Sequence, residues 1–182
     1  MSEELEKNSI RKHYRELITN ISSMRRIEAQ KAAFQELKEL TKPFSLILSF
    51  SSTADEVSLW HLNYYLAGTG RLVLPRIDGG HLAPYQVDDP DTQLIRGPYQ
   101  IEEPDPSRCR AVDLDKVDLI IVPGIAFDRD GGRIGRGKGF YDRLLASVNL
   151  TYKIGVGFKE QLYPSKLPQE AFDRPVNRVC LY

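Results

Sequence analysis

Apolar residues recur with helical spacing near the start of the chain. They occupy positions i, i+4, i+7, i+8 and i+11 and form a single stripe, namely Ile10, Tyr14, Leu17, Ile18 and Ile21. This spacing predicts an amphipathic helix over residues 10–21. Lys7 and Arg11 are one helical turn apart and fall on or beside the stripe rather than opposite it. We therefore expect these two cations to face protein rather than solvent.

Helical and strand-like patterns alternate along the rest of the chain. The helical segments are residues 23–40, 51–68 and 140–148, and the strand-like apolar runs are residues 44–50, 71–77, 117–127 and 152–158. Residues 78–110 are richer in Pro, Gly and Asp, which predicts a hairpin or an irregular excursion. The alternation predicts a three-layer α/β fold with helices on both faces of a mainly parallel sheet. No linker or repeat interrupts it, so we expect residues 1–182 to form one domain.

The composition narrows the class of protein. The 182 residues include 25 Lys and Arg and 25 Asp and Glu, so the formal net charge is zero. A broad nucleic-acid surface needs a basic surplus, so we expect no nucleic-acid partner. The first residues are polar, and no apolar run approaches the ~18 residues of a membrane span, so we expect neither secretion nor a membrane partner. Cys109 and Cys180 lack metal-site spacing, which favours a reducing cytoplasmic location.

The segment 128–143 (DRDGGRIGRGKGFYDR) combines many glycines with many cations. Five of the nine residues from Gly131 to Gly139 are glycine, and five cations face three carboxylates across the segment. It lies between a predicted strand and a predicted helix, where open α/β sheets bind ligands. Glycines leave backbone N–H groups accessible to an anion, and Arg133, Arg136 and Lys138 add positive charge. The pattern predicts a phosphate-binding loop, and the alternative is a flexible surface loop with solvated arginines.

Two phosphate-binding templates do not fit this loop. GRIGRGKG, residues 132–139, follows the P-loop pattern until Gly139 stands where a metal-binding Ser or Thr belongs. GRGKG followed by Phe140 departs from GxGxxG, and a dinucleotide motif would follow an early strand rather than a late one. The sequence therefore disfavours both a P-loop NTPase and a Rossmann dehydrogenase.

The stretch VPGIAFDRDGGRIGRGKGFYDRLL, residues 122–145, closely resembles the signature of the 5-formyltetrahydrofolate cyclo-ligase family, also called methenyltetrahydrofolate synthetases. Weaker likenesses to this family occur in the right order at KNSIR (7–11), at residues 53–77, at GPYQIEEP (97–104) and at LPQEAFDRPVNRVC (167–180). The resemblance implies ATP- and Mg²⁺-dependent conversion of 5-formyltetrahydrofolate to 5,10-methenyltetrahydrofolate through phosphorylation of the formyl oxygen. Such chemistry needs positioning and charge neutralisation rather than a protein nucleophile. We expect the enzyme to be a monomer.

The same resemblance implies a role for each matching residue. The catalytic residues would be Lys138, Tyr141 and Arg136. ATP would be bound by Lys7, Arg11, Arg133, Gly135, Gly137 and Gly139. The folate would be bound by Ser51, Glu56, Arg136 and Phe140. The magnesium carboxylates would be Asp142 and Asp173.

Several of these residues have ordinary structural alternatives. Lys7 and Arg11 could be solvated helix charges with packed stems, and Glu56 could be a carboxylate in the first turn of a helix. Asp142 could offset a helix dipole, and Asp173 could be a cap or an ion-pair partner.

The sequence also departs from the family pattern. Phe140 stands where the family often has a tyrosine, and Asn177 stands where it has an aspartate. These changes bear on folate selectivity more than on the ATP chemistry. Two rival functions are a non-catalytic folate- or nucleotide-binding regulatory module of the same fold and a sugar-phosphate isomerase of similar layers.

Overall fold

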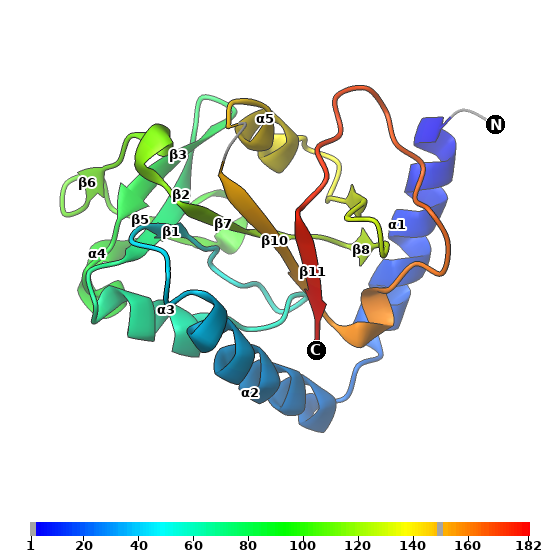
Figure 1. Cartoon of the computed structure of the whole chain (residues 1–182), viewed down its shortest axis with the longest axis horizontal. Coiled ribbons are helices and arrows are strands. Elements are labelled where there is room, and N and C mark those ends of the chain that lie inside the picture. Colours follow the sequence, from blue (N-terminus) through cyan, green and yellow to red (C-terminus); the bar gives the residue numbers. More distant parts are fainter. Residues whose placement is uncertain (1–2, 149–150) are drawn as a thin grey trace.

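Seven strands form the central sheet of the computed structural model, which describes residues 3–148 and 151–182 (Figure 1). Their order across the sheet is β11 (Arg178–Leu181), β10 (Tyr152–Gly157), β7 (Leu119–Pro123), β1 (Ile47–Leu48), β2 (Leu72–Asp78), β3 (His81–Gln86) and β6 (Arg110–Ala111). The five strands from β11 to β2 pair in parallel, and β3 pairs antiparallel with β2 and β6. The predicted mainly parallel sheet is confirmed.

Helices cover both faces of this sheet. α2 (Ser23–Leu40) and α3 (Trp60–Ala67) lie on one face and α5 (Phe140–Ala146) lies on the other (Figure 1). Neighbouring strand residues point to opposite faces, so Ile47 joins the core under α2 and α3 while Leu48 joins the core under α5. Burial on both faces explains why the central strands read as continuous apolar runs rather than alternating ones.

Helix α1 (Glu3–Thr19) packs beside the sheet rather than on a face of it. Its residues Ile10 and Tyr14 form a separate small core with Ala126 and Ile134, which belong to a two-stranded hairpin of β8 (Ala126–Phe127) and β9 (Arg133–Ile134). Lys7, on the same side of α1, is only 2% exposed. The predicted helix and the inward orientation of its first lysine are confirmed.

The helix predicted over residues 51–68 begins only at Trp60, so that prediction is wrong for its first nine residues. Side chains there bind the backbone in place of a helical ladder. The Oγ of Ser52 accepts a hydrogen bond from the N–H of Leu59 at 2.9 Å. Glu56 Oε2 accepts one from the N–H of Thr53, also at 2.9 Å. Such local bonds compete with helix formation, and Glu56 is therefore a turn residue rather than a first-turn helix carboxylate.

The long strand predicted over residues 117–127 is divided in two, because the chain leaves the sheet at Gly124. Gln161 replaces a neighbouring strand there: its Nε2 donates to the carbonyls of Gly124 at 2.7 Å and Ile125 at 3.0 Å. A side chain at position 124 would come within 2.6 Å of the ring of Phe127. The break turns β8 away from the sheet and toward α1.

The region 78–110 contains hairpin pairing, which is one of the two forms that its composition predicts. Gly79 and Gly80 connect β2 to β3, and β4 (Leu94–Arg96) pairs with β5 (Glu102–Pro104). The remaining short elements are α4 (Pro90–Gln93) and the 3-10 turns η1 (Pro98–Gln100), η2 (Leu114–Lys116) and η3 (Lys159–Gln161). Within residues 3–148 and 151–182, no helix has the length and apolar character needed to cross a membrane.

Candidate functional site

The glycine-rich loop is anchored at its base by one carboxylate. Asp128, 1% exposed, accepts hydrogen bonds from the backbone N–H of Asp130 at 2.9 Å, of Gly132 at 2.7 Å and of Leu167 at 2.9 Å. Further along, Gly137 has φ 95° and Gly139 has φ 67°. Both values lie in the left-handed region that residues with a Cβ rarely adopt. The loop is thus a shaped structure rather than a flexible surface segment.

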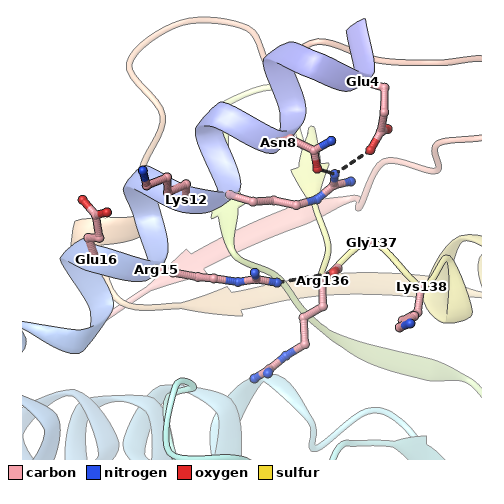
Figure 2. A pocket seen from close by; sticks show the side chains of 9 residues that line it. Glu4, Asn8, Lys12, Arg15, Glu16, Arg136, Gly137 and Lys138 are labelled. Carbon is pink, nitrogen blue, oxygen red and sulfur yellow. Dashed lines mark hydrogen bonds and ion pairs between the residues drawn. The ribbon is translucent and has the colours of Figure 1, made fainter.

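One side of the loop faces α1 across a cavity of about 490 Å³, which we call the cationic cavity (Figure 2). The charged side chains that line it are Arg11, Lys12, Arg15, Arg136 and Lys138, with Glu4 and Glu16. Five cations against two carboxylates give this cavity a positive field. Such a field suits the phosphates of a nucleotide.

The other side of the loop faces a second cavity of about 350 Å³, which we call the apolar cavity. Its apolar wall includes Phe50, Pro75, Ile77, Leu82, Ile101 and Phe140. Its polar side chains include Ser51, Thr53, Glu56, Glu103, Arg133 and Asp142. An apolar cavity with a few convergent polar groups is the usual form of a site for a small organic ligand.

Arg15, Arg136 and Lys138 line both cavities. The Arg136 side chain points away from α1 (Figure 2) and donates to Thr53 Oγ1 at 2.6 Å and to Glu56 Oε1 at 3.2 Å. Lys138 is exposed and forms no hydrogen bond or ion pair with the residues that the structure describes. Its ammonium group is therefore available to a ligand at the boundary of the two cavities.

Arginines of α1 hold the loop through its carbonyls. Arg11 Nε donates to Gly135 O at 3.1 Å, and Arg15 donates to Arg136 O at 3.4 Å (Figure 2). Arg15 was missed by the sequence reasoning, although it lies four residues after Arg11 and hence on the same face of α1. Helical spacing alone could have found it.

Lys7 lies apart from the two cavities. Its Nζ is 2.5 Å from Glu170 Oε2 and 2.5 Å from Asp173 Oδ2. Burial acts to lower the pKa of Lys7, but the hydrogen bonds and charges of Asp173 and Glu170 outweigh it and raise the pKa. Lys7 is therefore charged at neutral pH and is held by two carboxylates.

An ion pair between two residues of the apolar-cavity wall, Arg133 and Asp142, is largely buried. Arg133, 8% exposed, donates to Asp142 Oδ1 at 2.6 Å, and its guanidinium lies 6.0 Å from the ring centre of Tyr141. Burial raises the pKa of Tyr141 well above its ordinary value, the charge of Glu56 adds to this, and Arg133 opposes it. The Tyr141 hydroxyl thus keeps its proton at neutral pH and can act as a hydrogen-bond donor.

The fold brings most of the predicted site residues together. Those that line the apolar cavity are Ser51, Glu56, Arg133, Gly135, Arg136, Lys138, Gly139, Phe140, Tyr141 and Asp142. Arg11 and Gly137 line the cationic cavity. Among the described residues, Lys7 and Asp173 line neither cavity and instead pair with each other.

The two predicted magnesium carboxylates are each paired with a cation. In residues 3–148 and 151–182, no group of three or more His, Cys, Asp or Glu side chains could hold a metal ion by itself. Asp142 Oδ2 and Asp173 Oδ1 nevertheless form no hydrogen bond to the described residues. Since Mg²⁺ usually takes one or two carboxylates together with phosphate oxygens, these hard donors fit an ion that arrives with a nucleotide.

The mostly parallel sheet with helices on both faces defines a protein of the α/β class, with the glycine-rich loop between two cavities. The chain belongs to the 5-formyltetrahydrofolate cyclo-ligase family, whose model matches residues 3–182. The predicted family and fold class are thereby confirmed.

Curated relatives carry the same family name. The chain is 28% identical over 182 residues to the 5-formyltetrahydrofolate cyclo-ligase of Haemophilus influenzae, a match that covers 93% of this chain and 94% of the relative. Over 77 residues it is 39% identical to the mouse 5-formyltetrahydrofolate cyclo-ligase. This match covers 40% of this chain and 37% of the mouse protein. The match to a probable 5-formyltetrahydrofolate cyclo-ligase of Schizosaccharomyces pombe is 31% identical over 119 residues and covers 58% of each.

Two solved structures share the fold. The 5,10-methenyltetrahydrofolate synthetase of Aquifex aeolicus superposes with a TM-score of 0.85 at 33% identity and covers 95% of this chain and 88% of its own. The 5,10-methenyltetrahydrofolate synthetase of Mycoplasma pneumoniae, at 18% identity and a TM-score of 0.75, covers 95% and 96% and supports the fold alone.

Proposed function

We propose that this protein catalyses the ATP-dependent cyclisation of 5-formyltetrahydrofolate to 5,10-methenyltetrahydrofolate, with release of ADP and phosphate. The observation that carries the proposal is the boundary between the two cavities, where Arg136 and Lys138 line both. A nucleotide in the cationic cavity and a folate in the apolar cavity would meet at these two side chains.

The reaction requires two transfers in sequence. The N5-formyl oxygen attacks the γ-phosphorus of ATP, the bond to ADP breaks, and an imidate phosphate forms. N10 then attacks the activated formyl carbon and loses its proton, and the C–O bond breaks with its electron pair leaving on phosphate. The product is the 5,10-methenyl cation. Neither transfer needs a protein nucleophile, so the protein acts through positioning and charge.

Lys138 and Arg136 neutralise the phosphoryl group as it moves between the substrates. Lys138 serves as the principal cation, because its ammonium has no competing partner among the described residues. Arg136 also faces the folate, and Tyr141 donates its hydroxyl proton as a hydrogen bond. Arg11, with the loop glycines Gly135, Gly137 and Gly139, holds the nucleotide phosphates, and Arg133 supports the loop from its buried pair with Asp142.

The pterin end of the folate occupies the apolar cavity. Phe140 and the neighbouring apolar side chains bury its flat ring, while Ser51 and Glu56 bind its polar edge. Lys7 would reach the nucleotide by exchanging Glu170 or Asp173 for a phosphate oxygen. Asp142 and Asp173 would hold Mg²⁺ through their free oxygens, and the ion would neutralise phosphate charge.

The proposal also includes a cellular compartment, an oligomeric state and the kind of partner. Both cysteines, Cys109 and Cys180, are buried free thiols, which supports a reducing compartment such as the cytosol. We propose that the protein acts on a small molecule and does so as a monomer. No nucleic-acid or membrane partner enters the proposal.

Incubation of the purified protein with 5-formyltetrahydrofolate, ATP and Mg²⁺ should produce methenyltetrahydrofolate. The increase in methenyltetrahydrofolate absorbance measures the rate. Lys138→Ala should lower kcat by about 100- to 1000-fold, the usual loss for a cation at a developing charge. Lys166→Ala, an exposed lysine outside both cavities, is the matched control and should behave like the wild type. Binding of both ligands without product would instead favour the non-catalytic regulatory module, and equal turnover by the Lys138 variant would remove that residue from the chemistry.

A further inference from the structure

Three residues that line the apolar cavity carry buried polar atoms without hydrogen-bond partners. Within the part of the chain that the structure describes, four buried side-chain atoms have no hydrogen-bond partner: Ser51 Oγ, Glu103 Oε2, Arg133 Nε and Tyr182 Oη. The first three belong to residues that line the apolar cavity. Because an unpaired buried polar atom destabilises a fold, such a concentration indicates a polar ligand that completes their hydrogen bonds.

Glu103 is the residue of this group that has no role so far. It lies on β5, is 2% exposed, and has Arg76 as its nearest cation, 3.7 Å from Oε2. That guanidinium nitrogen already donates to Pro104 O at 3.0 Å. Burial raises the pKa of Glu103 above its ordinary value, and a hydrogen bond from the backbone of Ile77 and the charge of Arg76 lower it only in part. The protein therefore tolerates a poorly satisfied carboxyl group at this position.

The surrounding backbone is built to accept this carboxyl group. Gly97, which precedes the turn between β4 and β5, packs directly against the Glu103 side chain, and a Cβ at position 97 would collide with Cδ of Glu103. The glycine thus leaves the space that the carboxyl group occupies. Glu102, the preceding residue on β5, is exposed and has no such environment.

Glu56 differs from Glu103 in its hydrogen bonds. Both oxygens of Glu56 already accept bonds within the protein, from the Thr53 N–H at 2.9 Å and from Arg136 at 3.2 Å. A reduced pterin carries N–H donors at N3, at N8 and on its 2-amino group, which is more than one occupied carboxylate can satisfy. The second carboxyl group of the cavity has an oxygen to spare.

The geometry points to Glu103 as a further folate-binding residue, whose unpaired oxygen accepts a hydrogen bond from an N–H group of the pterin ring. This assignment rests on the proposed folate substrate. It makes Glu103 a determinant of specificity, because a ligand without an N–H donor would leave its carboxyl group unpaired.

Calorimetric titration with 5-formyltetrahydrofolate tests the assignment. Glu103→Gln keeps the shape of the side chain and one of its two hydrogen-bond acceptors. Glu103→Leu removes both acceptors and keeps a side chain of similar size. We expect Kd to rise about 10-fold for Gln and about 100-fold for Leu, the range for hydrogen bonds to a charged group, with Glu102→Gln within about twofold of the wild type. Gly97→Ala, which displaces the carboxyl group, should weaken folate binding as well. The Kd of a non-hydrolysable ATP analogue should stay within about twofold in all four variants.

The outcomes separate this inference from the proposed function. Folate binding by Glu103→Gln and Glu103→Leu within about twofold of the wild type would overturn the role of Glu103 and leave the proposed function intact. Loss of cooperative thermal unfolding in Glu103→Gln would show that Glu103 is needed for the fold, and it would also overturn the proposed folate-binding role. Absence of folate binding by the wild-type protein would overturn the proposed function and this inference together.

Discussion

The two cavities beside the glycine-rich loop share Arg15, Arg136 and Lys138 but differ in almost everything else. α1 lines the cationic cavity with the exposed cations Lys12 and Arg15 and with Arg11, which is half-buried and paired with Glu4. The apolar cavity is lined by the ends of sheet strands and contains buried groups, including the Arg133–Asp142 pair and Glu103. The cationic cavity therefore depends more on solvent-screened charges, and the apolar cavity depends more on groups that are largely shielded from water.

Two arginines, one exposed and one buried, illustrate this difference between the cavities. Arg136, with a side chain 41% exposed, pairs with Glu56 at 3.2 Å, whereas Arg133, with a side chain 3% exposed, pairs with Asp142 at 2.6 Å. Exposed pairs contribute little because solvent screens them, and buried pairs are costly to break because a lone charge stays inside. The same residue type thus serves the ligand at one position and the fold at the other.

The largest expected difference between the two cavities is in the stability lost when Arg133 or Arg136 is truncated to alanine. Arg133→Ala should lower the free energy of unfolding by about 3 kcal/mol, because it leaves Asp142 unpaired. Arg136→Ala should lower it by less than about 1 kcal/mol. Urea denaturation at neutral pH measures both. The double variant Arg133→Ala/Asp142→Asn should recover part of the loss, and equal losses for the two single variants would contradict the distinction.

Salt should separate the two cavities by a smaller effect. Raising KCl from about 0.05 M to about 0.5 M should increase the KM for ATP by about fivefold, while the KM for 5-formyltetrahydrofolate changes by less than about twofold, since the screening length shortens several-fold. Steady-state kinetics with each substrate varied in turn gives both values. Lys12→Ala should flatten the ATP dependence, with Lys166→Ala as control. Parallel responses would mean that the cavities do not differ electrostatically.

The smallest effect concerns the pH dependence of stability in the apolar cavity. The pKa of Glu103 is raised from 4.5 by burial, so its contribution is present below that pH and is lost as pH rises through the raised folded-state value. Relative to the wild type, Glu103→Gln should therefore be more stable at about pH 8 than at about pH 4. Urea denaturation across this range tests it. A difference that stays constant with pH would show that Glu103 titrates normally.

Local patterns predicted much of the fold but not its interruptions. The apolar stripe of α1 and the extent of α2 were readable because burial recurs with the helical period. The turn before Trp60 and the break at Gly124 were not readable, because Ser52, Glu56 and Gln161 hold them through side-chain bonds to the backbone. Periodicity carries no information about such bonds.

The candidate site divides in the same way. The loop glycines and cations stand together in the sequence, and their composition alone indicates anion binding. The family likeness at residues 97–104 does not single out Glu103, since Glu102 beside it is chemically identical and only the folded structure buries one of the two. Its place beside the cavity became visible only in the folded structure, where Glu103 lines the cavity and packs against Gly97.

By itself, the sequence determined the α/β class, the glycine-rich loop and the family resemblance, because burial periods and backbone freedom are properties of neighbouring residues. Only the tertiary structure decided that the loop lies between two unlike cavities. Arg11 reaches the loop across 124 positions of the chain, and Arg136 reaches Glu56 across 80. Such distances are set by strand register and helix packing, which no local pattern contains.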